Sequence, residues 1–238
     1  EAHILVNFLD NPKIKFPAIS LVVSGGHTQL ILVKGIGKYR IIGETRDDAA
    51  GECFDKCAKI LGLEYPGGPI ISKIASEIKQ SPDGRAIEDP RKNRDSIKLP
   101  RPMISTKDYD FSFSGLKTAV LYTVRDKQQL AKNKKFIQEV CHEVQQAIID
   151  VLVKKTVNAV KNYKAKTMIL GGGVSANQEL RRQLKEMLNK ESPNIKYLVP
   201  DPKYSTDNAL MIGITGFFHK KEKTAWQKIE ADANLRIS

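Results

Sequence analysis

Residues 21–33, LVVSGGHTQLILV, contain two apolar runs separated by a short polar turn. The runs 21–23 and 30–33 consist only of Leu, Val and Ile, a composition typical of strands buried on both faces of a sheet. The glycine pair between them, Gly25 and Gly26, favours a tight hairpin. The sequence therefore predicts two antiparallel strands in the interior of a sheet.

The turn itself carries more polar side chains than a hairpin needs. Ser24, His27, Thr28 and Gln29 add hydrogen-bonding groups around the two glycines. Glycine allows a backbone to approach a ligand closely, and successive N–H groups can then point at an anion. The residues alone leave two interpretations open, an ordinary tight turn and a cradle for a phosphate group.

The remaining hydrophobic pattern predicts an α/β fold. Residues 20–46 have the pattern of three consecutive strands, with YRIIGETR as the third, and helical spacing follows from residue 49, interrupted by YPGGP. Residues 80–110 are rich in proline and charge and are predicted to form an extended surface segment. Further helices are predicted at 113–126, 134–163 (amphipathic), 178–190 and after STDN, with strands at KTMIL and IKYLVP.

Composition points to a polyanionic partner. The 238 residues include 39 Lys and Arg against 27 Asp and Glu, a formal net charge of +12 and an isoelectric point near 9.5. Basic side chains that meet phosphates release condensed counterions, which favours nucleic acid; a solvated lysine-rich surface is the alternative. No apolar run approaches the roughly 18 residues of a membrane span. No secretory leader is evident, and the abrupt start at Glu1 suggests that an upstream part is missing.

Three cysteines, Cys53, Cys57 and Cys141, do not make a disulfide framework, so a reducing cytoplasm is expected. Cys53 and Cys57 stand four residues apart on one face of a predicted helix, where a metal pair is conceivable. No second pair of ligands accompanies them. Burial as small hydrophobic side chains is therefore the preferred interpretation, for Cys141 as well.

Three further features could carry chemistry. GGGVSAN follows a predicted strand and precedes a helix, with Ser175 or Asn177 as N-cap. Its backbone could approach a nucleotide in front of the helix dipole, and an ordinary strand-to-helix turn is the alternative. Asp207 of STDN stands where a carboxylate commonly caps a helix. His3 lacks the second histidine that a zinc-protease motif requires.

Five motifs in this order resemble the tRNA N6-adenosine threonylcarbamoyltransferase family (TsaD). They are the hairpin, DDAAGECFDK, YPGGP, GGGVSAN and STDNALMIG. The resemblance runs from residue 1 to about 220 and is weakest over 80–103. It implies the two-lobed actin-like ATPase fold, of the sugar kinase and chaperone ATPase type, without most of the first lobe. Residues 20–204 would form the second lobe with a helical insertion, and residues 1–19 and 205–238 a remnant of the first.

The resemblance favours the phosphate cradle and implies a set of substrate contacts. The matching positions are Val22, Val23, Ser24, Gly25 and Gly26 of the hairpin, with Asp55, Gly68 and Asn177. An ionised Asp only accepts hydrogen bonds and suits ribose hydroxyls, whereas Asn can donate and accept at a base or sugar edge. His27 is expected to contact the ligand without acting as a base.

The resemblance also implies one divalent metal ion per subunit, iron or zinc. Family members use two histidines of an H-x-x-x-H pair and the aspartate of the TDN motif. His3 matches the second histidine and Asp207 the aspartate. The first histidine would precede Glu1, so this chain contains two of the three expected ligands.

The activity that the resemblance implies is transfer of a threonylcarbamoyl group from threonylcarbamoyl-adenylate to N6 of the adenosine next to the tRNA anticodon. The donor is already activated, so the protein must orient it and no residue need be a covalent nucleophile. Expected partners are tRNA, with basic residues of 85–107 and 154–166 as contacts, and either accessory proteins or a second copy of the chain. The fragment itself is expected to be inactive. A small-molecule kinase and a non-catalytic nucleic-acid-binding scaffold are the alternatives.

Overall fold

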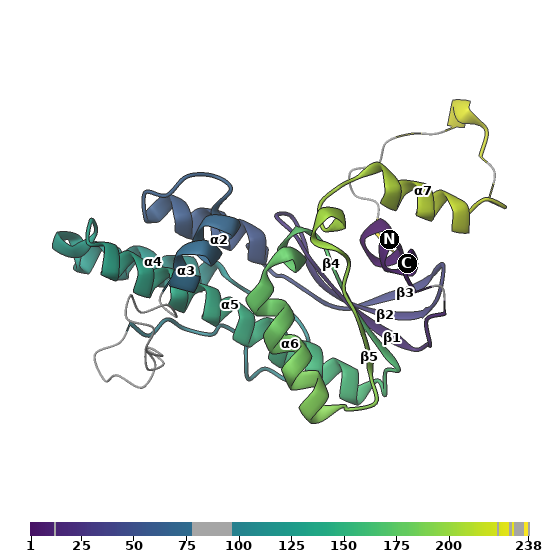
Figure 1. The fold of residues 1–238 in the computed structure, drawn as a ribbon, viewed down its shortest axis with the longest axis horizontal. Coiled ribbons are helices and arrows are strands. Elements are labelled where there is room, and N and C mark those ends of the chain that lie inside the picture. The colour runs from purple at the N-terminus through teal and green to yellow at the C-terminus, as the bar shows by residue number, and fades with distance from the viewer. Residues whose placement is uncertain (12, 78–96, 223, 229, 231–235, 238) are drawn as a thin grey trace.

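The computed structural model describes all residues except 12, 78–96, 223, 229, 231–235 and 238. At its centre is a mixed five-stranded sheet in the order β3-β2-β1-β4-β5 (Figure 1). The strands are β1 (Ala18–Val23), β2 (Thr28–Gly35), β3 (Lys38–Glu44), β4 (Thr167–Gly171) and β5 (Lys196–Leu198). β1 is antiparallel to β2 and parallel to β4. The predicted α/β class and the three consecutive strands are confirmed.

The helices follow the predicted pattern closely. They are α1 (Ala2–Leu5), α2 (Ala50–Ile60), α3 (Gly67–Glu77), α4 (Ser114–Asp126), α5 (Lys134–Asn162), α6 (Gln178–Glu191) and α7 (Ala209–Phe218). Short 3-10 turns also occur at η1 (Val6–Phe8), η3 (Gln128–Leu130), η4 (Gly173–Ala176), η5 (Pro202–Tyr204) and η6 (Trp226–Lys228). Within the described part of the chain, no helix is long and apolar enough to cross a membrane.

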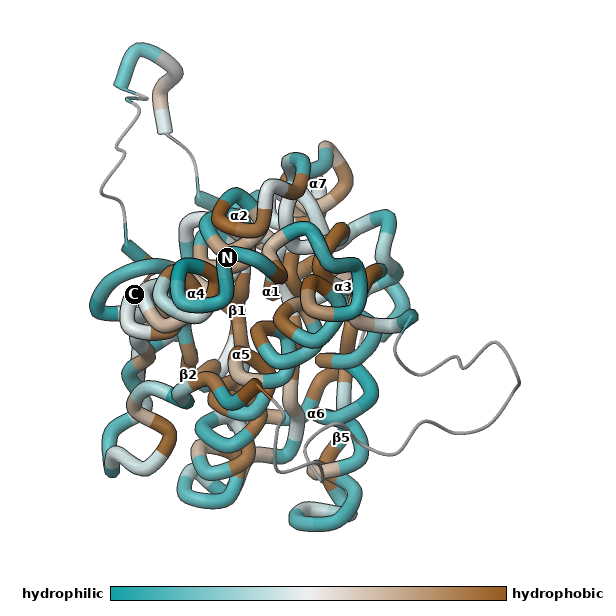
Figure 2. The backbone as a smooth tube through the Cα atoms, turned by 90° about the vertical axis from the view of Figure 1, so that its left-hand side faces the viewer, coloured by the Kyte–Doolittle hydropathy of each residue, from teal (hydrophilic) through white to brown (hydrophobic). Residues whose placement is uncertain are grey.

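Alternate residues of β1 enter two different cores. Ile19, Leu21 and Val23 lie in a large core shared with the helices α2 to α6. Ala18 and Val22 lie on the opposite face of the sheet in a smaller cluster that α1 covers in part. Because successive side chains of a strand point to opposite faces, an unbroken apolar run is what burial on both faces requires. Figure 2 shows the hydrophobic segments gathered along β1 and α5, inside a hydrophilic outer layer.

α5 is buried over most of its circumference. Phe136, Ala147, Ile149 and Val153, outside the predicted apolar stripe, are buried too. The residues of that stripe are all buried or partly buried: Ile137, Val140, Cys141, Val144, Ile148, Val151, Leu152 and Val157. The helix packs against α2, α3, α4 and α6 and also contacts β1. A single amphipathic stripe was therefore too narrow a prediction, because neighbours cover α5 from several sides.

The segment 97–110 is held on α5 by charged side chains. Arg101 forms ion pairs with Glu143 and Asp150 of α5, and Leu99 is buried. Lys155 is only 1% exposed and its Nζ lies 3.2 Å from Oδ1 of Asp108. Residues 97–110 contain no helix or strand, and Leu99 is the one buried residue among them, so the predicted surface segment is found there although it is fastened to α5, and residues 80–96 lie outside the described residues.

All three cysteines are core residues, as predicted. Cys53, Cys57 and Cys141 are fully buried, and the Sγ atoms of Cys53 and Cys57 are 3.9 Å apart. The contact with Cys57 and burial raise the pKa of Cys53, and burial raises the pKa of Cys141 to about 12. Both thiols therefore stay protonated at neutral pH.

Candidate functional site

The hairpin turn leaves its two glycines open. The N–H of Ser24 donates to the carbonyl of His27 at 2.8 Å, and the N–H of His27 donates to Ser24 Oγ at 3.1 Å. A Cβ built on Gly25 or Gly26 would meet nothing within 4 Å. Within the described part of the chain, the N–H groups of both glycines have no hydrogen-bond partner. The turn is therefore closed at its base and free at its tip, as an anion cradle requires.

The amino end of α2 lies directly against this turn. The N–H of Gly51 donates to the carbonyl of Ser24 at 3.2 Å, and a Cβ on Gly51 would come 2.5 Å from that oxygen. Thr28 Oγ1 accepts from the N–H of Ala50 at 2.8 Å, which supplies the cap that Ala49 cannot provide. Thr28 is fully buried, so the prediction that it faces the concavity is wrong.

Asp55 and Gly68 lie where α2 meets α3. Oδ1 of Asp55 accepts a hydrogen bond from the N–H of Gly67 at 2.8 Å and so fixes the start of α3. The second carboxylate oxygen has no partner within the described residues. A Cβ on Gly68 would lie 3.8 Å from Phe54, an ordinary contact that leaves the position accessible.

The GGGVSAN segment passes close to the end of β1. Gly172 has φ +85° and a Cβ there would lie 2.4 Å from the carbonyl oxygen of Val23, so only glycine fits. Asn177 is the N-cap of α6: Oδ1 accepts from the N–H of Leu180 at 3.0 Å, and Nδ2 donates to Gln145 at 2.8 Å. Of the two predicted caps, Asn177 is therefore the one used, whereas Ser175 is buried in η4.

His3 and Asp207, near opposite ends of the chain, meet in space. His3 Nε2 lies 3.3 Å from Oδ1 of Asp207, and the side chain of Asp207 is 96% exposed. The N-cap of α7 is Asn208, so capping by Asp207 is not observed. Burial lowers the pKa of His3, although the Asp207 charge opposes this, and its buried Nδ1 has no hydrogen-bond partner among the described residues.

A neutral imidazole beside a free carboxylate is a donor set that suits a divalent metal ion. Among the described residues, no group of three His, Cys, Asp or Glu side chains converges on one point. His3 and Asp207 therefore fit part of a metal site.

One cavity lies between His3 and the hairpin strands β1 and β2, and Asp207 is not among its lining residues. Its volume is about 430 Å³, and its lining includes Val22, His27, Gln29, His3, Glu44 and Arg236. Asp55, Gly68 and Asn177 do not line this cavity. Asp55 is in α2, Gly68 is in α3 and Asn177 directly follows η4, and α2 contacts both α3 and η4. Glu44 and Arg236, 3.2 Å apart, were not predicted. The sequence could have indicated Glu44, because it lies opposite Gln29 on the neighbouring strand of the predicted sheet.

Together these elements form a surface suited to a phosphate compound. The free glycine N–H groups and the amino end of α2 offer partial positive charge to an anion. His3 lies on the same cavity as the hairpin residues Val22 and His27.

The chain is similar to proteins of a known family. A family model described as tRNA N6-adenosine threonylcarbamoyltransferase matches residues 1–214. The protein of that name from Thermosipho africanus (strain TCF52B) is 43% identical, covering 99% of this chain and 66% of the relative. Those from Endomicrobium trichonymphae and Desulfitobacterium hafniense (strain Y51) are 41% and 43% identical over 93% and 94% of this chain. The chain spans 59% and 60% of their lengths.

A solved structure shares the fold at low sequence identity. Full-length HypF, in a phosphate- and nucleotide-bound form, superposes with a TM-score of 0.63 and 12% identity. The match covers 94% of this chain and 36% of HypF. At this identity the likeness concerns the fold alone.

Proposed function

Because the chain belongs to the tRNA N6-adenosine threonylcarbamoyltransferase family, we propose that the whole protein transfers a threonylcarbamoyl group from threonylcarbamoyl-adenylate to N6 of the adenosine next to the tRNA anticodon. The observation that carries this proposal is the family match over 1–214, which includes every expected substrate residue and both metal residues that this chain contains. The relatives are named as transferases, so the kinase and scaffold alternatives are not favoured.

The reaction needs an oriented donor rather than a protein nucleophile. The N6 amine attacks the carbonyl carbon of the mixed anhydride, and a C–N bond forms. The C–O bond to phosphate breaks, AMP leaves with the electron pair, and one N6 proton passes to solvent. Holding amine and carbonyl in line supplies the main rate advantage.

The hairpin residues would bind the phosphate of the donor. The N–H groups of Gly25 and Gly26 are free to donate, while Val22, Val23 and Ser24 hold the turn at the end of β1. Stabilising the phosphate also stabilises AMP as the leaving group, because negative charge develops there during transfer.

The nucleoside end would lie along α2. The unpartnered oxygen of Asp55 can accept from a ribose hydroxyl, and Gly68 leaves room for the ligand. The Asn177 side chain uses one donor and one acceptor in the protein, so one of each remains for the ligand.

His3 and Asp207 would hold one divalent ion, iron or zinc. Such an ion supplies positive charge near the donor phosphate when it is bound. The lowered pKa of His3 keeps its imidazole neutral, which is the form that binds metals. The remaining ligand would come from the residues of the whole protein that precede Glu1.

We extend the proposal to a two-lobed actin-like fold in the whole protein. Residues 20–204 would be the second lobe, with 1–19 and 205–238 belonging to the first. α1 contacts α7, and α7 leaves Ile212 and Phe217 64% and 61% exposed. Exposed apolar side chains of this kind support a further layer of structure that packs against α7 in the whole protein.

The proposed partners are tRNA and threonylcarbamoyl-adenylate in the cytoplasm, with accessory proteins or a second copy of the chain. The net charge of +12 supports the RNA partner. Arg101 and Lys155, within the basic ranges expected to contact tRNA, are committed to internal ion pairs and are excluded from that role. Residues 85–96 lie outside the described residues.

The test is a transfer assay with the full-length protein. Unmodified tRNA is incubated with the full-length protein and the adenylate-forming enzyme. The tRNA is then digested to nucleosides, and threonylcarbamoyladenosine is measured. Gly26→Ala should fold, since its Cβ meets nothing, yet crowd the phosphate and reduce the rate at least tenfold. Gly115→Ala, also without a close contact, is the matched control. No product from the unmodified protein would refute the function.

A further inference from the structure

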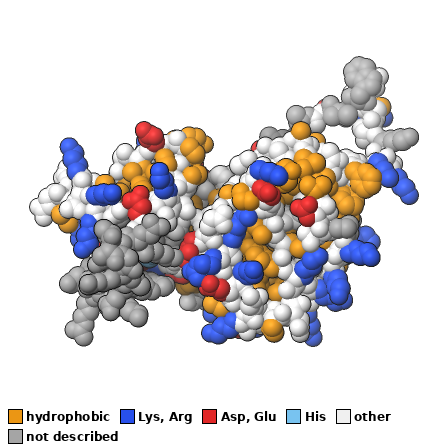
Figure 3. Space-filling view, viewed as in Figure 1, with side chains coloured by type: hydrophobic (Ala, Val, Ile, Leu, Met, Phe, Trp, Pro, Cys, Tyr) orange, Lys and Arg blue, Asp and Glu red, His pale blue; other side chains and the backbone are white. Residues whose placement is uncertain are grey.

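A strongly basic tip lies at one end of the molecule. It comprises residues 117–135, which contain most of α4, η3 and the first two residues of α5. Its basic residues are Lys117, Arg125, Lys127, Lys132, Lys134 and Lys135, and its only acidic residue is Asp126. Figure 1 places α4 at the far left end, and Figure 3 shows Lys and Arg side chains around that end.

Most of this charge is uncompensated. Arg125 contacts Asp126 at 3.3 Å, and Lys134 lies 3.8 Å from Glu77, both at exposed positions. Exposed pairs at such distances contribute little. Within the described part of the chain, no carboxylate lies within 4.0 Å of Lys127, Lys132 or Lys135. The tip therefore differs from the segment 97–110, where carboxylates neutralise the buried cations.

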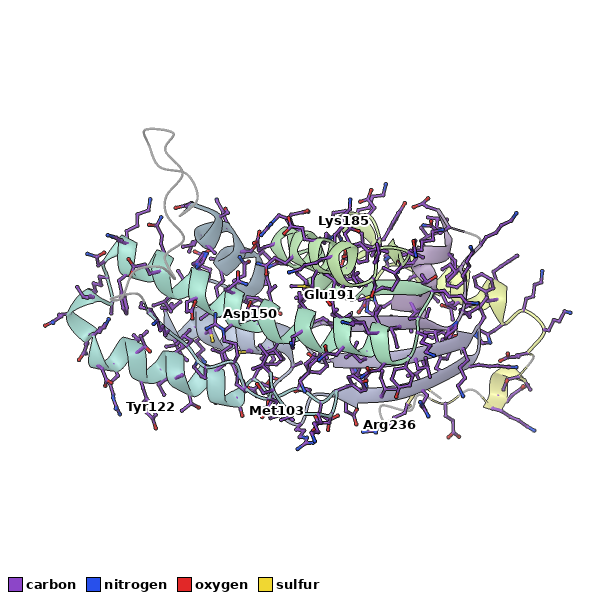
Figure 4. All side chains as sticks on the ribbon, turned by 90° about the horizontal axis from the view of Figure 1, so that it is seen from below. Met103, Tyr122, Asp150, Lys185, Glu191 and Arg236 are labelled. Carbon is purple, nitrogen blue, oxygen red and sulfur yellow. The ribbon has the colours of Figure 1, made fainter. Side chains whose placement is uncertain are left out.

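An exposed aromatic ring accompanies these cations. Tyr122 is 49% exposed, and the guanidinium of Arg125 lies 4.7 Å from its ring centroid. Figure 4 shows Tyr122 on the side of α4 turned away from α5. Leu121, beside it, is 46% exposed. Aromatic rings beside cations are the surface chemistry that binds unpaired bases and their backbone.

Hydrogen bonds connect the start of α4 to the candidate site. α4 begins at Ser114, whose N–H and hydroxyl both donate to Asp47, just before α2. α2 in turn begins at the hairpin turn. The 13 residues of α4 rise about 20 Å along its axis. A long substrate held at the hairpin could therefore reach the tip without any change in the fold.

We propose that this basic tip docks the sugar–phosphate backbone of the tRNA substrate, with Tyr122 stacking on an exposed base. The proposal rests on the proposed function and adds the surface that holds the RNA outside the reaction site. An acidic protein would also match the charge. RNA is favoured because the exposed ring and the uncompensated cations occur together.

The experiment measures tRNA affinity of the full-length protein at several salt concentrations. The tip variant carries Gln at Lys127, Lys132, Lys134 and Lys135. The control variant carries Gln at Lys13, Lys15, Lys34 and Lys38, exposed lysines before β1 and at the β2–β3 turn, outside the ranges expected to contact tRNA. Both variants lose the same charge. The tip variant should bind at least tenfold more weakly, with a slope of log affinity against log salt about 2–3 smaller. Tyr122→Ala should weaken binding roughly tenfold, and Tyr122→Phe should not.

The outcomes separate this inference from the proposed function. Equal losses in the tip and control variants, or no loss in either, would overturn the tip as a docking surface while transfer activity of the unmodified protein still supports the function. Selective loss in the tip variant without any transfer activity would support the tip and refute the function. Adenylate nucleotide affinity, measured on each variant, must be unchanged, since the tip lies outside the nucleotide site. A loss of nucleotide affinity in the tip variant alone would contradict the assignment.

Discussion

His3 Nε2 lies 3.3 Å from Asp207 Oδ1, although the two residues are near opposite ends of the chain. The contact arises because α1 packs against both β4 and α7. A Cβ on Gly171, the last residue of β4, would lie 2.5 Å from the carbonyl oxygen of His3, so this close packing requires glycine. Gly171 thus allows His3, the proposed metal ligand, to pack against the end of β4.

Removal of either side chain should weaken metal binding in the full-length protein. His3→Ala and Asp207→Ala should each lower the metal affinity by roughly ten- to a hundredfold, because each removes one of few ligands. The metal content of the purified protein should fall accordingly. Metal per subunit, measured by elemental analysis after dialysis, checks this. His219→Ala is the control, since His219 contacts Glu1 and Glu222 instead.

Residues 1–238 alone should hold metal poorly and transfer no threonylcarbamoyl group. His3 and Asp207 are the two proposed ligands, and the described residues supply no third, whereas a catalytic metal ordinarily has three protein ligands. Elemental analysis and the transfer assay of this fragment, beside the full-length protein, provide the test. A stoichiometric metal in the fragment would show that His3 is wrongly assigned.

Gly172→Ala should destabilise the protein by more than about 2 kcal/mol, through backbone strain and overlap with Val23. The position has φ +85° and a Cβ would lie 2.4 Å from the Val23 carbonyl oxygen. Gly173→Ala is the matched control, because its Cβ would meet only Thr206, at 3.8 Å. The free energy of unfolding by chemical denaturation measures both. Equal effects of the two substitutions would contradict this role for Gly172.

The strands and helices could be predicted because they depend on short-range patterns. The buried runs of β1 and β4 and the helical spacing of α5 and α6 are visible in the sequence itself. The roles of Thr28, Arg101 and Lys155 could not be predicted. Each is a polar residue whose partner lies far along the chain, so its burial depends on tertiary contacts that no local pattern encodes.

The candidate site divides in the same way. The tight turn at SGGH could be predicted from its glycine pair, but the residues alone left open whether those glycines form an ordinary turn or an open cradle. The GGG segment looks similar in sequence, yet Gly171 and Gly172 pack against backbone of α1 and β1 instead of facing open space. Composition alone cannot separate an open glycine from one that permits close packing.

Asp47 should stabilise the start of α4 in a pH-dependent way. Burial alone would raise its pKa, but hydrogen bonds from Ser112, Ser114 and the N–H of Phe113 lower the pKa overall. The folded pKa thus lies below the unfolded value of about 3.9. The stabilisation is complete above that value and is lost as pH falls through the folded pKa.

Asp47→Ala should lower the free energy of unfolding by about 1–2 kcal/mol at pH 7. Denaturation curves recorded between pH 7 and pH 2.5 measure how the difference from the unsubstituted protein changes. It should shrink at the acid end, where the native carboxylate is protonated. A difference that stays constant over this range would exclude the ionised carboxylate as the cause.

The Lys155–Asp108 pair should respond asymmetrically to substitution. Asp108→Ala leaves the buried ammonium of Lys155 without its carboxylate and should cost about 3 kcal/mol. Lys155→Met removes the buried charge and keeps the apolar stem, so its cost should be below about 1 kcal/mol. Asp108 is 41% exposed and can return to solvent in that variant. Thermal or chemical unfolding of both variants gives the comparison, and a larger loss for Lys155→Met would contradict it.

Asp55 should contribute to nucleotide binding separately from its role in the fold. Asp55→Asn keeps an oxygen that can accept from the N–H of Gly67, now 2.8 Å away, but loses the charge offered to a ribose hydroxyl. It should weaken binding of an adenylate analogue by about 1.5–3 kcal/mol, with little change in unfolding. Asp55→Ala should lose both affinity and about 1 kcal/mol of stability, because the start of α3 loses its acceptor. Calorimetric titration and denaturation of the two full-length variants separate the effects. Unchanged affinity in Asp55→Asn together with reduced stability in Asp55→Ala would leave Asp55 with a structural role alone.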